Sequence, residues 1–226
     1  MRLPFANRAD AGAQLAHALL HLRGRQPLVL AIPRGGVPLG RIVADALGGD
    51  LDVVLVRKIG APGHAEFAVG AVDEQGTVLL NADAAEAGAD PAYVHAEAAR
   101  QLALIRERRQ RYGKGLGSDA ATKRTVIVVD DGLATGATML AALRAVRRQR
   151  PAWLVCALPV ASAEGLAEIR TVVDELVCLA TPAPFHAVGL YYRDFAAVEE
   201  DAVCTALHGA AAGPDRPRAP PPWIRS

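Results

Sequence analysis

Two adjacent carboxylates, Asp130 and Asp131, stand where they could accept hydrogen bonds from the hydroxyl groups of a sugar. Residues 125–138 read TVIVVDDGLATGAT, and the helix-forming sequence MLAALRAVRRQ follows directly. Residues 126–129 form a short apolar run typical of a buried parallel strand, and open α/β sheets bind ligands at the carboxyl ends of their strands. The small-residue loop after the acids would present free backbone N–H groups at the start of a helix, which suits a phosphate. The pattern therefore predicts a site for a sugar phosphate.

Simpler explanations of this pattern exist. An Asp-Asp pair after a strand also occurs as a turn and helix cap, and glycine-rich turns are common. The phosphate loop GxxxxGK[ST] is excluded because the segment lacks its spacing and contains no lysine, and the dinucleotide motif GxGxxG is absent as well. The ordered series of apolar strand, paired acids, glycines and threonines favours the phosphate site.

Residues 128–138 resemble the 5-phosphoribosyl-1-diphosphate (PRPP) signature of the type I phosphoribosyltransferases. The resemblance implies that the two acids hold the ribose 2′- and 3′-hydroxyls. It also implies that backbone amides and two threonine hydroxyls bind the 5′-phosphate. The residues so assigned to PRPP are Asp130, Asp131, Ala134, Thr135, Gly136, Ala137 and Thr138.

A second glycine turn, Pro33-Arg34-Gly35-Gly36, follows a strand predicted at residues 27–32. Two glycines let backbone amides approach an anion closely, and Arg34 can bind a phosphate through two N–H groups. Alone, the segment would be a surface turn with an incidental arginine. Beside the signature it resembles the family's diphosphate-binding loop, which assigns Arg34, Gly35 and Gly36 to PRPP. The resemblance also raises the expectation of a cis peptide bond in this loop.

Lys58 follows the second predicted strand, residues 51–56. The family has a mobile loop beginning about here that closes over the diphosphate, and the resemblance assigns Lys58 to PRPP. Residues 59–70 form an irregular, glycine-rich segment, as expected of a lid with hinges. His64 and Glu66 are candidate lid residues, although an ordinary exposed loop histidine explains His64 equally well.

The reaction implied is attack of a nitrogen nucleophile on C1 of PRPP, with loss of pyrophosphate. Such a displacement passes through an oxocarbenium-like state, so the leaving diphosphate must be neutralised. Arg34, Lys58 and Asp131 are the candidate catalytic residues, and Asp131 is hypothesised to take a proton from the nucleophile. Mg²⁺ is the expected cofactor, held mainly through substrate oxygens, with Asp130 and Asp131 as candidate protein ligands.

The acceptor stays open at the level of the sequence. The 6-oxopurine phosphoribosyltransferases read the base oxygen with a lysine after the fifth strand, but residues 158–162 read LPVAS and contain none. Phe185 lies near the position of the aromatic residue that stacks on the base in those enzymes. It is the candidate for base stacking, and a core phenylalanine is an equal alternative. The expected partners are therefore PRPP and a nucleobase-like acceptor.

The composition fits one α/β domain. At 226 residues, 51% hydrophobic and only 4% aromatic, the chain predicts a core of Ala, Val and Leu. Charges nearly balance, 25 Lys and Arg against 24 Asp and Glu, so nothing draws the chain toward nucleic acid or membranes. Three separated cysteines fit no metal spacing, and neither a signal peptide nor a spanning run is seen. We expect a cytoplasmic protein with a domain over residues 1–208 and a flexible tail over 209–226.

Predicted strands alternate with predicted helices through most of the chain, which favours a doubly wound sheet. The expected fold class is α/β, with a mostly parallel doubly wound sheet of the type I phosphoribosyltransferase kind and a small hood. Strands are expected at residues 27–32, 51–56, 69–72, 77–80, 126–129, 153–158 and 175–179. Helices are expected at residues 8–23, 37–47, 91–112, 139–149, 162–170 and 198–207.

Two other functions compete with the enzyme. A regulator of the same fold would bind PRPP or a nucleotide together with RNA or DNA, and basic residues cluster at 106–114 and 144–150. Both clusters end predicted helices, where cations complement the helix dipole, so nucleic acid is not the expected partner. A degenerate relative without chemistry is disfavoured by the intact acids, Arg34 and Lys58. The family resemblance also suggests a homo-oligomer.

Overall fold

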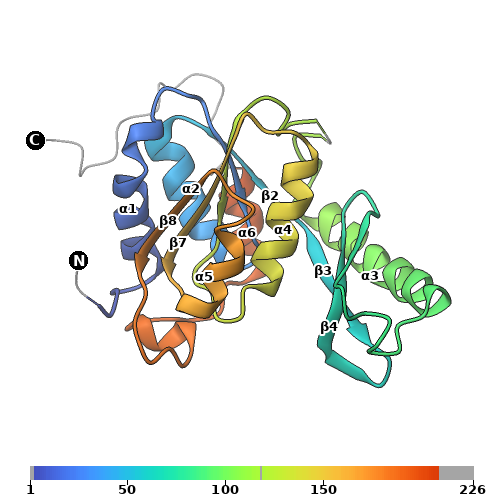
Figure 1. Ribbon diagram of the computed structural model, residues 1–226. Helices are drawn as coiled ribbons and strands as arrows, with labels where there is room; N and C mark the ends of the chain where they lie inside the picture. The colour runs from blue at the N-terminus through green and yellow to red at the C-terminus, as the bar shows by residue number, and fades with distance from the viewer. Residues whose placement is uncertain (1–2, 118, 209–226) are drawn as a thin grey trace, which may run out of the picture.

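Five parallel strands form the central sheet of the computed structural model, which describes residues 3–117 and 119–208 (Figure 1). The tail expected at 209–226 lies outside the described residues. The strand order is β2-β1-β6-β7-β8. This order reverses direction between β1 and β6, and such switch points are where open α/β sheets bind ligands. The strands are β1 (Leu28–Ala31), β2 (Asp50–Val53), β6 (Thr125–Val129), β7 (Trp153–Val160) and β8 (Glu175–Ala180).

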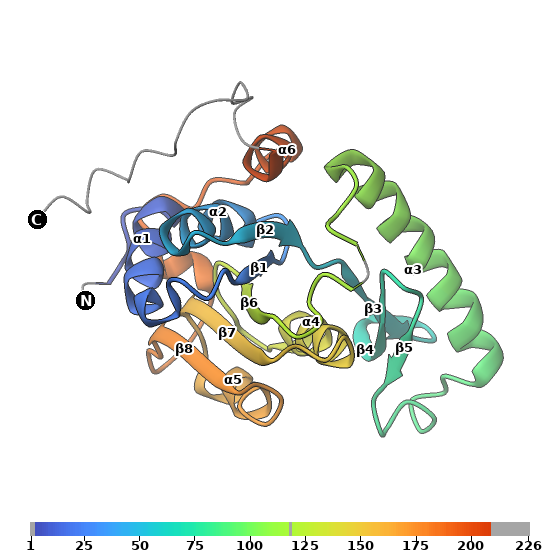
Figure 2. The same cartoon turned by 90° about the horizontal axis from the view of Figure 1, so that it is seen from above.

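Helices cover both faces of this sheet, as the doubly wound fold predicts (Figure 2). On one face α1 (Arg8–Ala18) and α2 (Gly36–Leu47) pack against inward residues such as Val29 and Ile127. On the other, α4 (Ala137–Arg148) and α5 (Ala163–Ile169) pack against Val126 and its neighbours. Because both faces are covered, all five residues of β6 are buried, which explains its unbroken apolar run.

A smaller unit, which we call the arm (residues 56–112), lies beside α4 (Figure 2). It consists of an antiparallel sheet, order β3-β4-β5, and the long helix α3. Asp90 caps α3 by accepting from the Tyr93 N–H, and Pro91 opens the helix where its missing N–H costs nothing. The arm's elements are β3 (Val56–Ala61), β4 (His64–Asp73), β5 (Val78–Leu80) and α3 (Pro91–Tyr112).

One part of the predicted arrangement is wrong. The second strand ends at Val53, and Lys58 lies within β3 instead of at a strand end. Most of residues 59–70 lie in strands, because β3 and β4 form a hairpin here, with register shifts on either side of Gly60. Its glycines serve pairing and turning: a Cβ on Gly60 would lie 2.6 Å from the Ala65 carbonyl oxygen, and Gly63 turns the hairpin at φ +74°. Glycines in close strand contact look the same in sequence as glycines in a hinge.

The remaining helices follow α1 and β8. The single-turn helices are η1 (Leu20–Leu22) and η2 (Val188–Tyr191), and α6 (Glu200–His208) packs against α2 and α3. Residues 5 and 192 form a parallel bridge, so the N-terminal segment lies against the segment that follows η2. Among the described residues, no helix is both long enough and apolar enough to cross a bilayer.

Candidate functional site

The acid pair stands at the carboxyl end of β6, at the switch point of the sheet. The Asp131 N–H donates to Asp130 Oδ1 over 2.9 Å. The Arg8 Nε–H donates to Asp131 Oδ2 over 2.8 Å, and Arg8 Nη2 forms an ion pair with the same oxygen, also at 2.8 Å. One oxygen of each carboxylate, Asp130 Oδ2 and Asp131 Oδ1, has no hydrogen-bond partner among the described residues. The pair therefore offers two free acceptor oxygens.

Burial dominates the electrostatics of this pair. Desolvation raises the pKa of Asp130 well above its usual range, and the neighbouring charge of Asp131 adds to this. Burial also raises the pKa of Asp131, although Arg8 opposes the shift. Two adjacent, partly buried carboxylates are costly to keep charged without a ligand that donates to them. Perturbed acids at a sheet's switch point are typical of a functional site.

The predicted diphosphate loop lies directly against the acids. A Cβ on Gly35 would come within 2.0 Å of Asp131 Oδ2, and one on Gly36 within 2.6 Å of the Val129 carbonyl oxygen. Only glycine allows this approach, so the two glycines bring the loop after β1 onto the end of β6. The peptide bond between Pro33 and Arg34 is cis, as expected from the resemblance. Arg34 itself is exposed, and its side chain makes no hydrogen bond or ion pair with the described part of the chain.

The predicted phosphate loop leads into α4. Gly136 precedes the helix at φ +82°, and no side chain caps the first turn. The N–H groups of that turn are therefore available to an anion. The loop is held against the end of β7 and the start of α5, because the Ser162 hydroxyl donates to the Ala134 carbonyl and the Leu133 N–H donates to the Val160 carbonyl.

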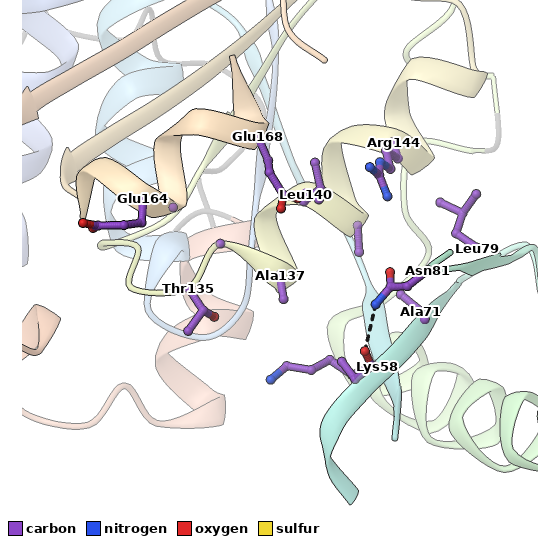
Figure 3. A pocket seen from close by; sticks show the side chains of 15 residues that line it. Lys58, Ala71, Leu79, Asn81, Thr135, Ala137, Leu140, Arg144, Glu164 and Glu168 are labelled. Carbon is purple, nitrogen blue, oxygen red and sulfur yellow. Dashed lines mark hydrogen bonds between the residues drawn. The ribbon is translucent and has the colours of Figure 1, made fainter. Parts of the chain in front are cut away.

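Lys58 and the phosphate loop line the same cleft, a cavity of about 220 Å³ between the arm and helices α4 and α5 (Figure 3). Lys58 reaches from β3 toward the side on which Thr135 lies. It is exposed and, among the described residues, has no hydrogen-bond or ion-pair partner. Arg144 of α4 and Glu168 of α5 lie further along the cleft. The structure thus brings Lys58 toward the phosphate loop, although it comes from the middle of a strand.

Other candidates lie apart from this cleft. His64 begins β4 at the tip of the hairpin and lines a separate hollow on the arm with Phe67. Glu66 belongs to the same strand. The ring of Phe185 stands 5.2 Å from that of Tyr191 and packs partly buried against the core. Its packing agrees with the core alternative, and base stacking stays a prediction.

Sequence reasoning missed three side chains around Asp131. Besides its hydrogen bond to Asp131, Arg8 lies 3.8 Å from the ring centroid of Phe195. The Tyr192 hydroxyl donates to the Asp131 carbonyl oxygen, and burial raises the pKa of Tyr192. No local motif marks these residues. One signal was available, since Arg8 opens α1 and a cation is unfavourable at the positive end of a helix dipole.

The basic clusters carry their own counter-charges. Arg109 is largely buried between Asp52 and Glu74, with contacts of 2.9 and 2.6 Å. Further pairs join Arg111 to Glu107, Arg147 to Asp174 and Arg148 to Asp73. Much of the basic charge is thus neutralised within the chain.

The acid pair also bears on the expected magnesium. Within residues 3–117 and 119–208, no group of three or more Asp, Glu, His or Cys side chains could hold a metal ion. Carboxylate oxygens are nevertheless ligands that Mg²⁺ prefers, and Mg²⁺ commonly uses one or two carboxylates together with substrate oxygens. The two free oxygens of Asp130 and Asp131 fit that mode.

Comparisons with known proteins identify similar chains. The family model described as the phosphoribosyl transferase domain matches residues 6–194. A Mycobacterium tuberculosis protein (strain CDC 1551 / Oshkosh) with the provisional name phosphoribosyl transferase MT0597 is 41% identical over 207 residues. The match covers 91% of this chain and 47% of that protein, and the same figures hold for Rv0571c of strain ATCC 25618 / H37Rv. The chain thus spans about half the length of these curated relatives.

The solved structures include a similar molecule over the full fold. The crystal structure of TT1426 from Thermus thermophilus aligns with a TM-score of 0.80 at 48% identity. The alignment covers 92% of this chain and 98% of that one.

Proposed function

Because this chain belongs to the phosphoribosyl transferase domain family, we propose that it transfers the 5-phosphoribosyl group of PRPP to a nitrogenous base and releases pyrophosphate. The observation that carries the proposal is the packing of Gly35 against Asp131. It joins the candidate diphosphate loop to the candidate ribose site at the carboxyl end of β6, in the chain segment that leads to the N-terminus of α4. These are the groups that a ribose carrying a phosphate and a diphosphate requires.

The ribose would be held by the free oxygens of the acid pair. Asp130 and Asp131 each commit one oxygen to the protein and leave one unpaired among the described residues. Two acceptors match the two donors of a cis-diol, and hydrogen bonds to a charged acceptor are strong.

The two phosphate ends would be held by different elements. The first-turn N–H groups of α4 and the hydroxyls of Thr135 and Thr138 suit the 5′-phosphate. The amides of the diphosphate loop, Arg34 and Lys58 would neutralise the leaving diphosphate as charge develops on it. Mg²⁺ held by substrate oxygens, with Asp130 or Asp131 as a protein ligand, would neutralise further charge there.

The role of Asp131 as proton acceptor is the most specific part of the proposal. Arg8 occupies its Oδ2, so only Oδ1 is available to a nucleophile. Asp131→Asn removes the basicity and keeps the shape. We expect turnover to fall about a hundredfold with bound PRPP retained in part, and an Asn variant with full turnover would exclude the role.

The acceptor is proposed only as a class. The segment after β7 lacks the lysine that reads the oxygen of a 6-oxopurine. The absence of this lysine favours a nitrogenous base other than a 6-oxopurine.

The test is pyrophosphate release from Mg²⁺–PRPP with a panel of purine and pyrimidine bases. The control is the double variant Asp130→Asn/Asp131→Asn, with its fold checked by circular dichroism. We expect release that depends on one base and disappears in the double variant. No release with any base, while the wild type binds PRPP and the double variant does not, would favour a regulator instead.

A further inference from the structure

We propose that Arg8 is a positioning residue of the ribose site. It would fix the Asp131 carboxylate so that Oδ1 and the free oxygen of Asp130 face the two hydroxyls of one ribose. This inference rests on the proposed function, because the ribose is that of PRPP. It assigns a role in the site to the N-terminal segment, 123 residues away from Asp131 along the chain.

Arg8 is held on three sides. Its Nε donates to Asp131 Oδ2 at 2.8 Å, its Nη2 forms an ion pair with that oxygen at 2.8 Å, and its Nη1 donates to the Ala196 carbonyl oxygen at 2.6 Å. Its guanidinium carbon lies 3.8 Å from the centre of the Phe195 ring. The side chains of Arg8 and Asp131 are each only 14% exposed. A guanidinium held this way has little freedom, and neither does the carboxylate oxygen that it binds.

The segment that carries Arg8 is itself fixed to the chain beyond η2. The Phe5 N–H donates to the Tyr191 carbonyl oxygen, and the Arg193 N–H donates to the Phe5 carbonyl oxygen, both at 2.8 Å. The Phe5 ring is fully buried, 5.4 Å from that of Tyr192. Tyr192 in turn donates to the Asp131 carbonyl oxygen. Asp131 is thus held at its carboxylate by Arg8 and at its backbone by Tyr192.

The position of Arg8 in the sequence argues against a purely structural salt bridge. An arginine in the first turn of a helix opposes the helix dipole. Burying an ion pair also costs desolvation that its attraction does little more than offset. Without Arg8, the Asp131 carboxylate could turn about its Cβ–Cγ bond, and its two oxygens would become equivalent. The diol would then bind a carboxylate that must first be ordered, which weakens binding.

The planar guanidinium of Arg8, with two nitrogens close to one carboxylate oxygen, matters as well as its charge. Lysine would keep a cation near Asp131 but offers one nitrogen in place of two that converge on the same oxygen. We therefore expect Arg8→Lys to recover only part of what Arg8→Gln loses.

The experiment is calorimetric titration of Mg²⁺–PRPP and of Mg²⁺–pyrophosphate into the wild type, Arg8→Gln and Arg8→Lys. Arg124→Gln is the matched control, because Arg124 also joins distant segments, pairing with Asp50 at 2.8 Å, but precedes the opposite end of β6. Thermal midpoints identify any variant that fails to fold. Arg8→Lys, which keeps the cation, serves as the test should Arg8→Gln be unfolded.

We expect the Kd for PRPP to rise about tenfold in Arg8→Gln, about the value of one hydrogen bond to a charged group. Arg8→Lys should fall between Arg8→Gln and the wild type. The Kd for pyrophosphate, which lacks the ribose, should stay unchanged, and Arg124→Gln should bind both ligands as the wild type does. The double variant Arg8→Gln/Asp131→Asn should bind PRPP no more weakly than Asp131→Asn alone.

Folded Arg8 variants that bind PRPP like the wild type would overturn the inference. Losses that add fully in the double variant, or that weaken pyrophosphate equally, would overturn it too. A wild type that binds no PRPP would instead refute the proposed function.

Discussion

At the scale of single residues, the site combines carboxylates and glycines that lower the stability of the folded chain. Asp130 and Asp131 lie side by side and partly buried, and desolvation raises the pKa of both. Gly35 and Gly36 leave room for the acids at the cost of chain entropy in the unfolded state. Such features are typical of a site in which binding is favoured at the expense of stability. Replacing the carboxylates should therefore weaken ligand binding without a matching loss of stability.

Asp130→Asn should lose PRPP binding and gain stability. A raised pKa in the folded state means that the native protein becomes less stable as the pH rises from the unfolded value, about 4, through the folded one. Because this cost grows as the pH rises above about 4, we expect Asp130→Asn to be about 1 kcal/mol more stable than the wild type at neutral pH. Scanning calorimetry should show a thermal midpoint about 2–4 °C higher.

The gain should shrink as the pH falls and disappear near about pH 3, where the wild-type carboxyl is protonated in both states. Asp119→Asn, an exposed position, is the control and should leave the midpoint unchanged at either pH. A destabilised Asp130→Asn at neutral pH would mean that the charge is stabilising after all.

Gly35→Ala should push the diphosphate loop away from the acids, because its Cβ would stand 2.0 Å from Asp131 Oδ2. We expect a loss of about 1–3 kcal/mol of stability and PRPP binding weakened more than tenfold, measured by urea unfolding and calorimetric titration. Gly12→Ala is the matched control. Its Cβ would lie 3.0 Å from Ile42 Cδ1 and 3.3 Å from the Leu39 Cα, which is far less close than the contact at Gly35, and it sits within a helix, which favours alanine. Equal effects of both changes would contradict the close approach as the reason for Gly35.

At the scale of elements, apolar runs and loops were predictable and long-range contacts were not. The buried strands β1 and β6 and the capped helix α3 agree with the sequence within a residue or two, since burial and capping leave local patterns. The β3–β4 hairpin was mistaken for irregular chain because its glycines resemble hinges. The contact of Arg8 with Asp131 joins residues 123 positions apart, so no local pattern could reveal it.

Ser162 couples two elements and should therefore matter for binding as well as for stability. Its hydroxyl caps α5 by accepting from the Gly165 N–H and donates to the Ala134 carbonyl in the phosphate loop. We expect Ser162→Ala to cost about 1–2 kcal/mol and to raise the Kd for PRPP severalfold, because the loop loses its anchor. Thr171→Ala, which removes an exposed hydroxyl bond to Glu168, is the control. Binding that is unchanged in a destabilised Ser162→Ala would show that the loop holds its shape unaided.

At the scale of the whole molecule, the sheet and the arm are joined by charges as well as by apolar contacts. Arg109 of α3 contacts Asp52 in β2 and Glu74 after β4, and its Nη2 donates to the Val53 carbonyl at 3.0 Å. This largely buried network positions β3, and β3 positions Lys58 over the cleft. The arm's placement is thus part of the site.

Arg109→Met should leave Asp52 and Glu74 without their cation in a partly buried setting. We expect the free energy of unfolding to fall by about 2–4 kcal/mol, measured by urea denaturation. Arg111→Met is the matched control, since it breaks an exposed pair with Glu107 on the same helix and should cost less than about 0.5 kcal/mol. A similar loss in both variants would mean that burial does not distinguish the two arginines.

The measurement that tests the central claim most directly is calorimetric titration of Mg²⁺–PRPP into the wild type and into Asp130→Asn/Asp131→Asn. The acid pair and the loops around it predict saturable binding at one site per chain. They also predict that the double variant stays folded and shows no binding over the same range. A wild type that does not bind PRPP, or a double variant that binds it equally well, would contradict the assignment of the acid pair to PRPP binding.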